Sequence, residues 1–184
     1  MITVALSNKI LSILLIIIVI VAAYTDITRR KIHNILTLPA IVVGLALNVI
    51  LPGQSGIWNS LLGFAVGFGI FLVMFLFGGM GGGDVKLMGA IGAFKGYPFI
   101  LDAMLFSIFT GGILALLVMA FRGTLLKGLK NIAQSVFSFL IPHVQAEPLI
   151  KEDSHKIPFG FCIAVGTIVA VISDKVFQFH FFPG

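Results

Sequence analysis

The chain has 184 residues, of which 59% are hydrophobic and only 10% are charged, and its formal net charge is +5. Soluble domains carry about 25% charged residues, so this composition excludes an ordinary soluble domain and indicates an integral membrane protein. Cys162 is the only cysteine, which excludes an internal disulfide. The basic residues lie in short clusters between apolar runs, where they set membrane orientation, so we expect no nucleic-acid partner.

Apolar runs long enough to cross a bilayer predict an all-α integral membrane protein with about six transmembrane helices. Residues 32–83 contain no Asp, Glu, Lys or Arg and are too many for one span, so the turn at 51–56 divides them. The expected helices cover residues 1–25, 35–51, 57–77, 84–96, 99–121 and 157–173. We expect them to form a single membrane-embedded domain over residues 1–184.

The basic residues predict the orientation of these helices. They cluster at Arg29–Lys31 after the first span and again in the polar stretch 122–156, whereas the turn at 51–56 carries no charge. Because cytoplasmic loops are rich in Lys and Arg, we expect the N-terminus outside. The loops expected in the cytoplasm are residues 26–34, 78–86 and 122–156, with the amphipathic residues 124–140 on the membrane surface. A cleaved signal peptide over residues 1–23 is an alternative, but its basic cluster would precede the apolar run.

Two aspartates stand out by position, Asp26 at the end of the first span and Asp84 at the start of the fourth helix. On the expected topology both lie near the cytoplasmic face, and an ionisable group in an apolar segment is a candidate functional residue. The alternative is structural, with Asp84 as an N-cap and Asp26 as an interfacial anchor. If the two carboxylates hold a water between them, one stays protonated as general acid while the other acts as general base.

Three glycines, Gly81–Gly83, directly precede Asp84, which is more than a helix cap requires. Glycines allow positive φ values and let another chain approach closely, so an extended substrate segment could pair with this backbone. A plain hinge between two helices is the alternative. A second pair of glycines, Gly63 and Gly67, permits close helix contact, either within the chain or in a homodimer.

The other polar residues of the apolar segments suggest structural roles. Asp102 and Asp174 are expected to be caps or interface anchors near the outer face, and Cys162 a small packing residue. The histidines lack the spacing of metal ligands, and they lie at His33, His143, His155 and His180. We therefore expect neither a metal nor a cofactor.

Two segments around the aspartates resemble those of the type IV prepilin peptidases. Asp26-Ile-Thr-Arg-Arg-Lys-Ile-His-Asn-Ile-Leu-Thr-Leu-Pro39 is similar to the first aspartate segment of that family. Gly81-Gly-Gly-Asp84-Val-Lys-Leu-Met-Gly-Ala-Ile-Gly-Ala-Phe94 is similar to its GxGD segment. Lys156-Ile-Pro-Phe-Gly160 resembles the start of the family's last helix. The similarity spans nearly the whole chain.

The resemblance implies a membrane aspartic endopeptidase that cuts the short, positively charged leader from type IV pilin-like precursors. Cleavage would take place on the cytoplasmic side of the bacterial plasma membrane, with the precursors and membrane lipid as partners. Carried over residue by residue, Asp26 and Asp84 become the catalytic pair. The residues implied in substrate binding or in shaping the loop are Gly81, Gly82, Gly83 and Lys86. Lys86 either tunes the electrostatics of the pair or holds the loop, and the alternative is a lysine that only extends to the membrane interface.

The larger family members differ, because they carry paired Cys-x-x-Cys motifs and also methylate the new N-terminus. With Cys162 alone, the chain is similar to the short, peptidase-only branch that serves Flp-type (tight-adherence) pili, so we expect no N-methyltransferase activity. Two other function classes stay open from the residues alone. One is a small ion-coupled transporter or channel in which Asp84 binds the ion, and the other is a non-catalytic subunit of a pilus or secretion assembly.

Overall fold

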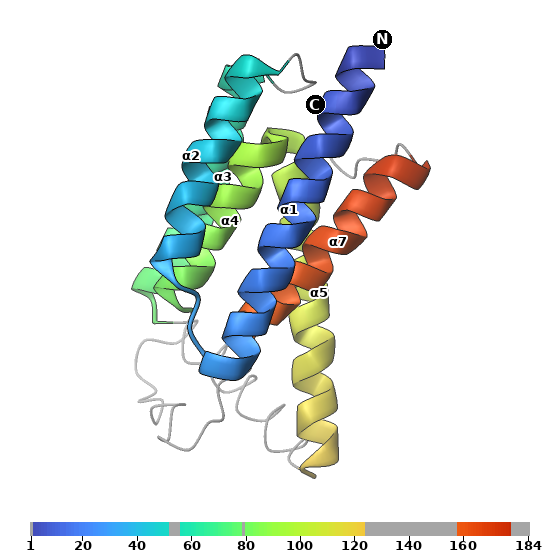
Figure 1. Cartoon of the computed structure of the whole chain (residues 1–184). Helices are drawn as coiled ribbons and strands as arrows, with labels where there is room; N and C mark the ends of the chain where they lie inside the picture. The colour runs from blue at the N-terminus through green and yellow to red at the C-terminus, as the bar shows by residue number, and fades with distance from the viewer. Residues whose placement is uncertain (1, 52–55, 79, 124–157, 178–184) are drawn as a thin grey trace, which may run out of the picture. The chain divides into compact units, whose positions relative to one another are not determined.

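The computed structural model describes residues 2–51, 56–78, 80–123 and 158–177, and within these ranges it contains six helices and no strand. The predicted all-α class is therefore confirmed. The helices are α1 (Ile2–Arg29), α2 (Asn34–Ile50), α3 (Gly56–Leu76), α4 (Gly82–Lys95), α5 (Tyr97–Phe121) and α7 (Phe159–Phe177) (Figure 1). The expected surface helix at 124–140 lies outside the described residues.

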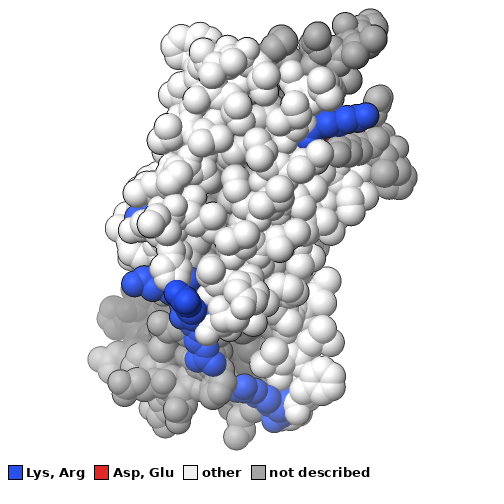
Figure 2. Space-filling model, viewed as in Figure 1, with Lys and Arg blue, Asp and Glu red and all other residues white. Residues whose placement is uncertain are grey.

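Three of these helices are long and apolar enough to cross a membrane unaided: α1 from Leu6, α3 and α5. Two shorter apolar helices, α2 and most of α7, accompany them. In Figure 2, several Lys and Arg side chains lie near the end of α1, and much of the face that is drawn shows neither charge. Helices of this length and composition suit a bilayer, and the chain is a membrane protein.

The chain divides into two compact units. The first comprises residues 1–111 and 158–184, and it contains both candidate aspartates. The second comprises residues 112–157. Its described part is the second half of α5, which ends in a turn where Gly123 has a φ of 64°.

Helix α4 is the central element of the first unit. It has 14 residues, which makes it about 21 Å long, less than the roughly 30 Å hydrocarbon core of a bilayer. It contacts α1, α2, α3 and α7, and nearly all of its residues from Asp84 to Phe94 are buried (Figure 1). A helix enclosed on all sides is held in place by its neighbours, so α4 fixes the position of the Asp84 carboxylate.

Glycines allow α3 and α4 to touch through their backbones. A Cβ atom on Gly63 would overlap the Gly92 carbonyl oxygen and Gly96, and one on Gly67 would lie 2.6 Å from the Met88 carbonyl oxygen. Gly92 in turn faces the backbone of Gly63. Gly63 and Gly67 were expected to permit close contact either within the chain or in a homodimer. The structure shows contact within the chain, because α4 packs against both glycines.

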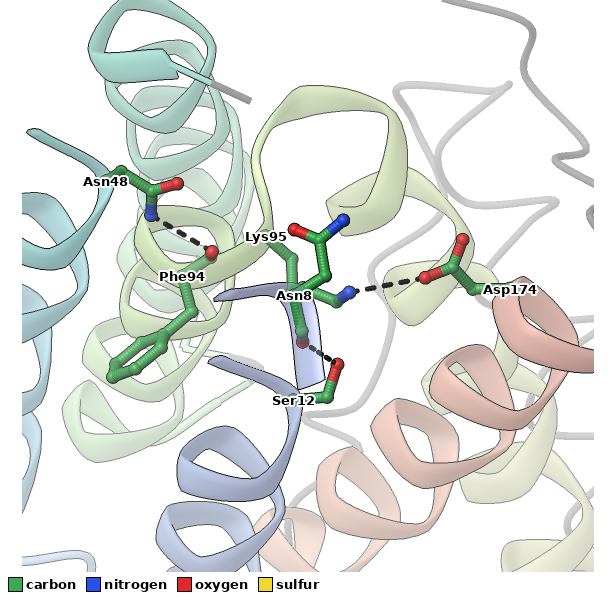
Figure 3. A network of polar contacts seen from close by, with 6 residues as sticks. All are labelled: Asn8, Ser12, Asn48, Phe94, Lys95 and Asp174. Carbon is green, nitrogen blue, oxygen red and sulfur yellow. Dashed lines mark hydrogen bonds and ion pairs between the residues drawn. The ribbon is translucent and has the colours of Figure 1, made fainter. Parts of the chain in front are cut away.

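The end of α4 remote from Asp84 is held by polar side chains of α2 and α3. The Asn48 side-chain amide donates to the carbonyl oxygens of Ala93 at 3.0 Å and Phe94 at 3.1 Å. The Ser60 hydroxyl also donates to the Ala93 carbonyl. The last carbonyls of a helix have no partner within it, so these buried donors complete the C-terminal end of α4. Figure 3 shows the bond from Asn48 to Phe94.

A partly buried ion pair joins α4 to α7 at this same end (Figure 3). Lys95 Nζ lies 3.2 Å from Asp174 Oδ2, and it also lies 5.3 Å from the centre of the Phe99 ring. Asp174 was expected to be an interface anchor, and the structure gives it a basic partner on another helix. The pair fixes the distance between α4 and α7 far from their N-terminal ends.

Candidate active site

Asp26 lies in the last turn of α1, which continues four residues beyond the predicted first span to Arg29. Its side chain is only 8% exposed. Ala22, Val19 and Leu15 precede it at helical spacing and are fully buried, so Asp26 continues the stripe of α1 that faces the protein interior. Asp26 is therefore not an anchor exposed at the membrane interface.

The Asp26 carboxylate reaches the start of α7. Its Oδ2 atom accepts a hydrogen bond of 2.7 Å from the backbone N–H of Gly160, a residue 134 positions away in the chain. Gly160 lies in the first turn of α7, where backbone N–H groups have no acceptor within the helix. Asp26 thus connects the end of α1 to the N-terminus of α7.

Asp84 lies in the first turn of α4, and it is also 8% exposed. The helix begins at Gly82, two residues earlier than predicted, so Gly81 rather than Asp84 is the N-cap. The Asp84 Oδ2 atom accepts a bond of 3.2 Å from the backbone N–H of Gly81. The expected N-cap position was wrong, but the carboxylate does bind the free N–H group that precedes the helix.

The glycines before Asp84 serve close packing and not unusual backbone angles. Gly81 has a φ of −83°, Gly82 and Gly83 are helical, and none of the three has a positive φ. A Cβ atom on Gly83 would lie 2.9 Å from the Cβ atom of Ile32. The close neighbour of Gly83 is thus a residue of the same chain, and pairing of Gly82 and Gly83 with an extended strand is incompatible with their helical conformation.

Ile32 connects the surroundings of the two aspartates. It is buried in the connection between α1 and α2, and its backbone and Cβ atom pack against Gly83. Its Cδ1 atom lies 2.8 Å from where a Cβ atom on Gly160 would be. Because Gly83 adjoins Asp84 and Gly160 binds Asp26, one apolar side chain packs against both halves of the site.

The two carboxylates interact electrostatically. The pKa of Asp84 is raised from its ordinary value near 3.8 to about 6. Burial is the largest cause of this shift, and the negative charge of Asp26 is the second. The Cys162 thiol, near the start of α7, also interacts electrostatically with both aspartates. Buried carboxyl groups that disfavour each other's charge can hold one proton between them, as acid–base hydrolysis requires.

Lys86 is directed toward α2 rather than toward the carboxylates. Its Nζ atom donates a hydrogen bond of 2.8 Å to the side-chain oxygen of Asn34, the first residue of α2. The causes of the raised pKa of Asp84 are burial, first, and the charge of Asp26. Of the two roles expected for Lys86, these contacts favour holding the start of α4 against α2.

Two residues of the site, Gly160 and Ile32, were not predicted as site residues. Gly160 acts through its backbone N–H, which has no signature in the sequence. The signal available was the Ile-Pro-Phe-Gly stretch at the start of the last helix, which had been assigned no role. Among the residues with described positions, no group of three or more His, Cys, Asp or Glu could hold a metal ion.

The fold and the site together define an all-α membrane protein with a pair of buried, interacting carboxylates. A sequence profile of the type IV leader peptidase family matches residues 13–116, which are more than half of the chain and include both aspartates. The chain therefore belongs to the type IV leader peptidase family and is a peptidase. No match was found among curated proteins or among solved structures.

Proposed function

We propose that this chain is an aspartic endopeptidase that removes the leader from type IV pilin-like precursors, with Asp26 and Asp84 as its catalytic residues. The observation that carries the proposal is the meeting of these two buried carboxylates, from α1 and α4, in a chain of the leader peptidase family. Cleavage takes place at the cytoplasmic face of the bacterial plasma membrane, without methylation of the new N-terminus.

The chemistry follows from two carboxyl groups that share one proton. The ionised group accepts a proton from a water molecule, whose oxygen attacks the scissile carbonyl, while the protonated group donates its proton to the carbonyl oxygen. The tetrahedral intermediate then collapses as the first group returns a proton to the leaving nitrogen and the second recovers one from a hydroxyl. Each carboxyl group ends in its starting state, and no covalent intermediate forms.

Substrate access requires a local movement at Ile32. Both carboxylates are 8% exposed, and Ile32 packs against Gly83 and Gly160 beside them. A scissile peptide must come within hydrogen-bonding distance of both carboxyl groups. Displacement of the short connection between α1 and α2 would open the site without unfolding any helix.

The test is cleavage of pilin-like precursors from the same genome in membranes that contain wild type, Asp26→Asn or Asp84→Asn. Each substitution keeps the shape of the side chain and removes its acid–base function. We expect wild type to convert the precursor to the shorter product, and each variant to lose at least about 1000-fold in rate, since each carboxyl group serves both proton transfers.

Asp102→Asn is the matched control, because Asp102 is a buried carboxyl group on another helix, α5, and is not one of the proposed catalytic residues. It should cleave as wild type does. Retained cleavage by Asp26→Asn or Asp84→Asn would contradict the aspartic mechanism, and it would favour the capping roles of these residues. Loss of cleavage in these variants would exclude a scaffold role, since a scaffold has no cleavage activity to lose.

A further inference from the structure

Gly160 contacts Asp26 through its backbone, and the space around it leaves no room for a side chain. A Cβ atom at Gly160 would lie 2.8 Å from Asp26 Oδ2, 3.1 Å from Asp26 Cβ and 2.8 Å from Ile32 Cδ1. The added atom would thus contact both the carboxyl group of Asp26 and its Cβ atom. A larger residue at this position must therefore displace either the carboxylate or the start of α7.

The hydrogen bonds of the two aspartates are unequal. Asp26 accepts its bond from Gly160 at 2.7 Å, within the range of strong N–H bonds to an ionised acceptor. Asp84 accepts its bond from Gly81 at 3.2 Å, at the long end of the normal range. The N–H of Gly160 also belongs to a helix N-terminus, whose dipole favours a negative charge nearby. The donor at Asp26 thus favours the charged carboxylate more than the donor at Asp84 does.

We propose that Gly160 is a positioning residue of the peptidase, whose backbone N–H orients Asp26 and keeps it ionised as the general base, which leaves Asp84 as the general acid. The proposal rests on the proposed function, since it divides the two roles of that dyad. It also gives the start of α7 a part in the reaction, through the backbone N–H of Gly160.

The main test is Gly160→Ala, with Gly112→Ala as the control. A Cβ atom at Gly112, a helical residue of α5, meets nothing within 4 Å, so this control adds the same methyl group in open space. We expect Gly160→Ala to lower kcat by about 100-fold, the effect of a small misplacement of a catalytic group, with KM little changed. Gly112→Ala should keep wild-type kinetics.

A pH profile separates positioning of the base from a purely structural role. The acidic limb of the kcat profile reports ionisation of the base. If Gly160→Ala weakens the hydrogen bond to Asp26, this limb should shift to higher pH by about one to two units. A packing defect would instead lower kcat equally at every pH. Among the described residues, Asp84 on α4 and Cys162 on α7 interact electrostatically with Asp26. Lys86 is bonded to Asn34, and α2 contains no charged residue.

A double variant shows which contact of Gly160 matters. Ile32→Val removes the Cδ1 atom that a Cβ atom at Gly160 would meet, but it leaves the clash with Asp26. If Gly160 positions Asp26, the Ile32→Val/Gly160→Ala variant should stay as impaired as Gly160→Ala. Restoration of wild-type activity by Ile32→Val would show that the role of Gly160 is packing against Ile32, and it would overturn the proposal.

Hydrogen exchange provides a measurement that does not depend on Gly160→Ala being folded. The Gly160 amide has no acceptor within α7, so Asp26 alone should protect it. We expect Asp26→Ala to raise exchange in the peptide that contains Gly160 by at least about 10-fold, and Asp26→Asn, which keeps an acceptor oxygen, to raise it much less. Unchanged exchange in Asp26→Ala would overturn the proposal.

The outcomes for this inference and for the proposed function are distinguishable. If Asp26→Asn and Asp84→Asn fail to cleave while Gly160→Ala cleaves as wild type does, the dyad stands and Gly160 has no positioning role. If Asp26→Asn still cleaves, the aspartic mechanism itself is wrong, and the assignment of Asp26 as base falls with it.

Discussion

At the scale of single residues, the site depends on keeping a carboxyl group buried where its charge is unfavourable. Asp84 is buried at the start of α4, a helix that contacts α1, α2, α3 and α7, and the charge of Asp26 adds to the cost of ionising it. The pKa of Asp84 is raised to about 6, so the folded state holds its proton over a pH range in which an unfolded aspartate has lost it. Burial of this carboxyl group therefore destabilises the fold at neutral pH.

This destabilisation predicts a pH-dependent effect of Asp84→Asn. Well below its ordinary pKa near 3.8, Asp84 is protonated in both the folded and the unfolded chain, so its ionisation does not affect stability. As the pH rises from about 4 to about 6, the unfolded chain loses this proton while the folded chain keeps it, so the free energy of unfolding falls by up to about 3 kcal/mol and then stays constant above pH 6. Asparagine cannot ionise, so Asp84→Asn should be more stable than wild type at pH 7.5.

Unfolding in detergent, measured for both proteins at pH 4 and pH 7.5, checks this. The measured quantity is the difference in the free energy of unfolding between Asp84→Asn and wild type. A difference that is the same at both pH values would contradict the assigned cost of ionisation.

The sequence was enough to identify the aspartates but not their partners. Asp26 and Asp84 are conspicuous because charges are rare in apolar segments, and that reasoning needs no structure. The bond from Gly160 to Asp26 joins residues 134 positions apart through a backbone N–H. Every non-proline residue has such a donor, so only the folded chain shows which one is used.

At the scale of the helices, glycines let α3 pack closely against α4, the helix that bears Asp84. Gly63 and Gly92 face each other through their backbones, and Gly67 packs against Met88 of α4. Close contact of this kind replaces the hydrophobic effect as the source of helix association within lipid. The length of apolar runs predicted the bounds of α2 and α3 to within a residue, because a span must match the bilayer. The enclosure of α4 was not predictable from its own composition, since its neighbours create it.

The close contact between Gly63 and Gly92 predicts that Gly92→Ala destabilises the fold. The added methyl group would overlap the Gly63 carbonyl, and α3 and α4 would have to separate. Overpacking of this kind costs about 1–3 kcal/mol, more than the roughly 1 kcal/mol that alanine gains over glycine in a helix. Gly69→Ala on α3 is the matched control, because its Cβ atom meets nothing within 4 Å. Denaturant titration in detergent should show a lower stability for Gly92→Ala only. Equal stability of the two variants would contradict close backbone contact between α3 and α4 at Gly92.

At the scale of the whole molecule, the distribution of charge predicts how the protein is inserted. Arg29, Arg30 and Lys31 are exposed beside the end of α1 that bears Asp26. At the opposite end of α4, Lys95 is paired with Asp174 and therefore contributes little net positive charge. Lys9, near the start of α1, adds one positive charge at that end. Among the described residues of the first unit, the cationic excess therefore lies at the end that bears Asp26 and Asp84, which the positive-inside rule places in the cytoplasm.

Labelling of single cysteines with a membrane-impermeant maleimide tests this orientation. In a Cys162→Ala background, we expect Trp58→Cys, at the start of α3, to react in intact cells, because Trp58 is 79% exposed at the end remote from the dyad. Lys31→Cys should react only after the membrane is permeabilised, since Lys31 lies exposed on the dyad side. The reverse pattern would place Asp26 and Asp84 outside the cell. A precursor whose basic leader remains in the cytoplasm could not then reach them, so the orientation decides whether this site can act on such a substrate at all.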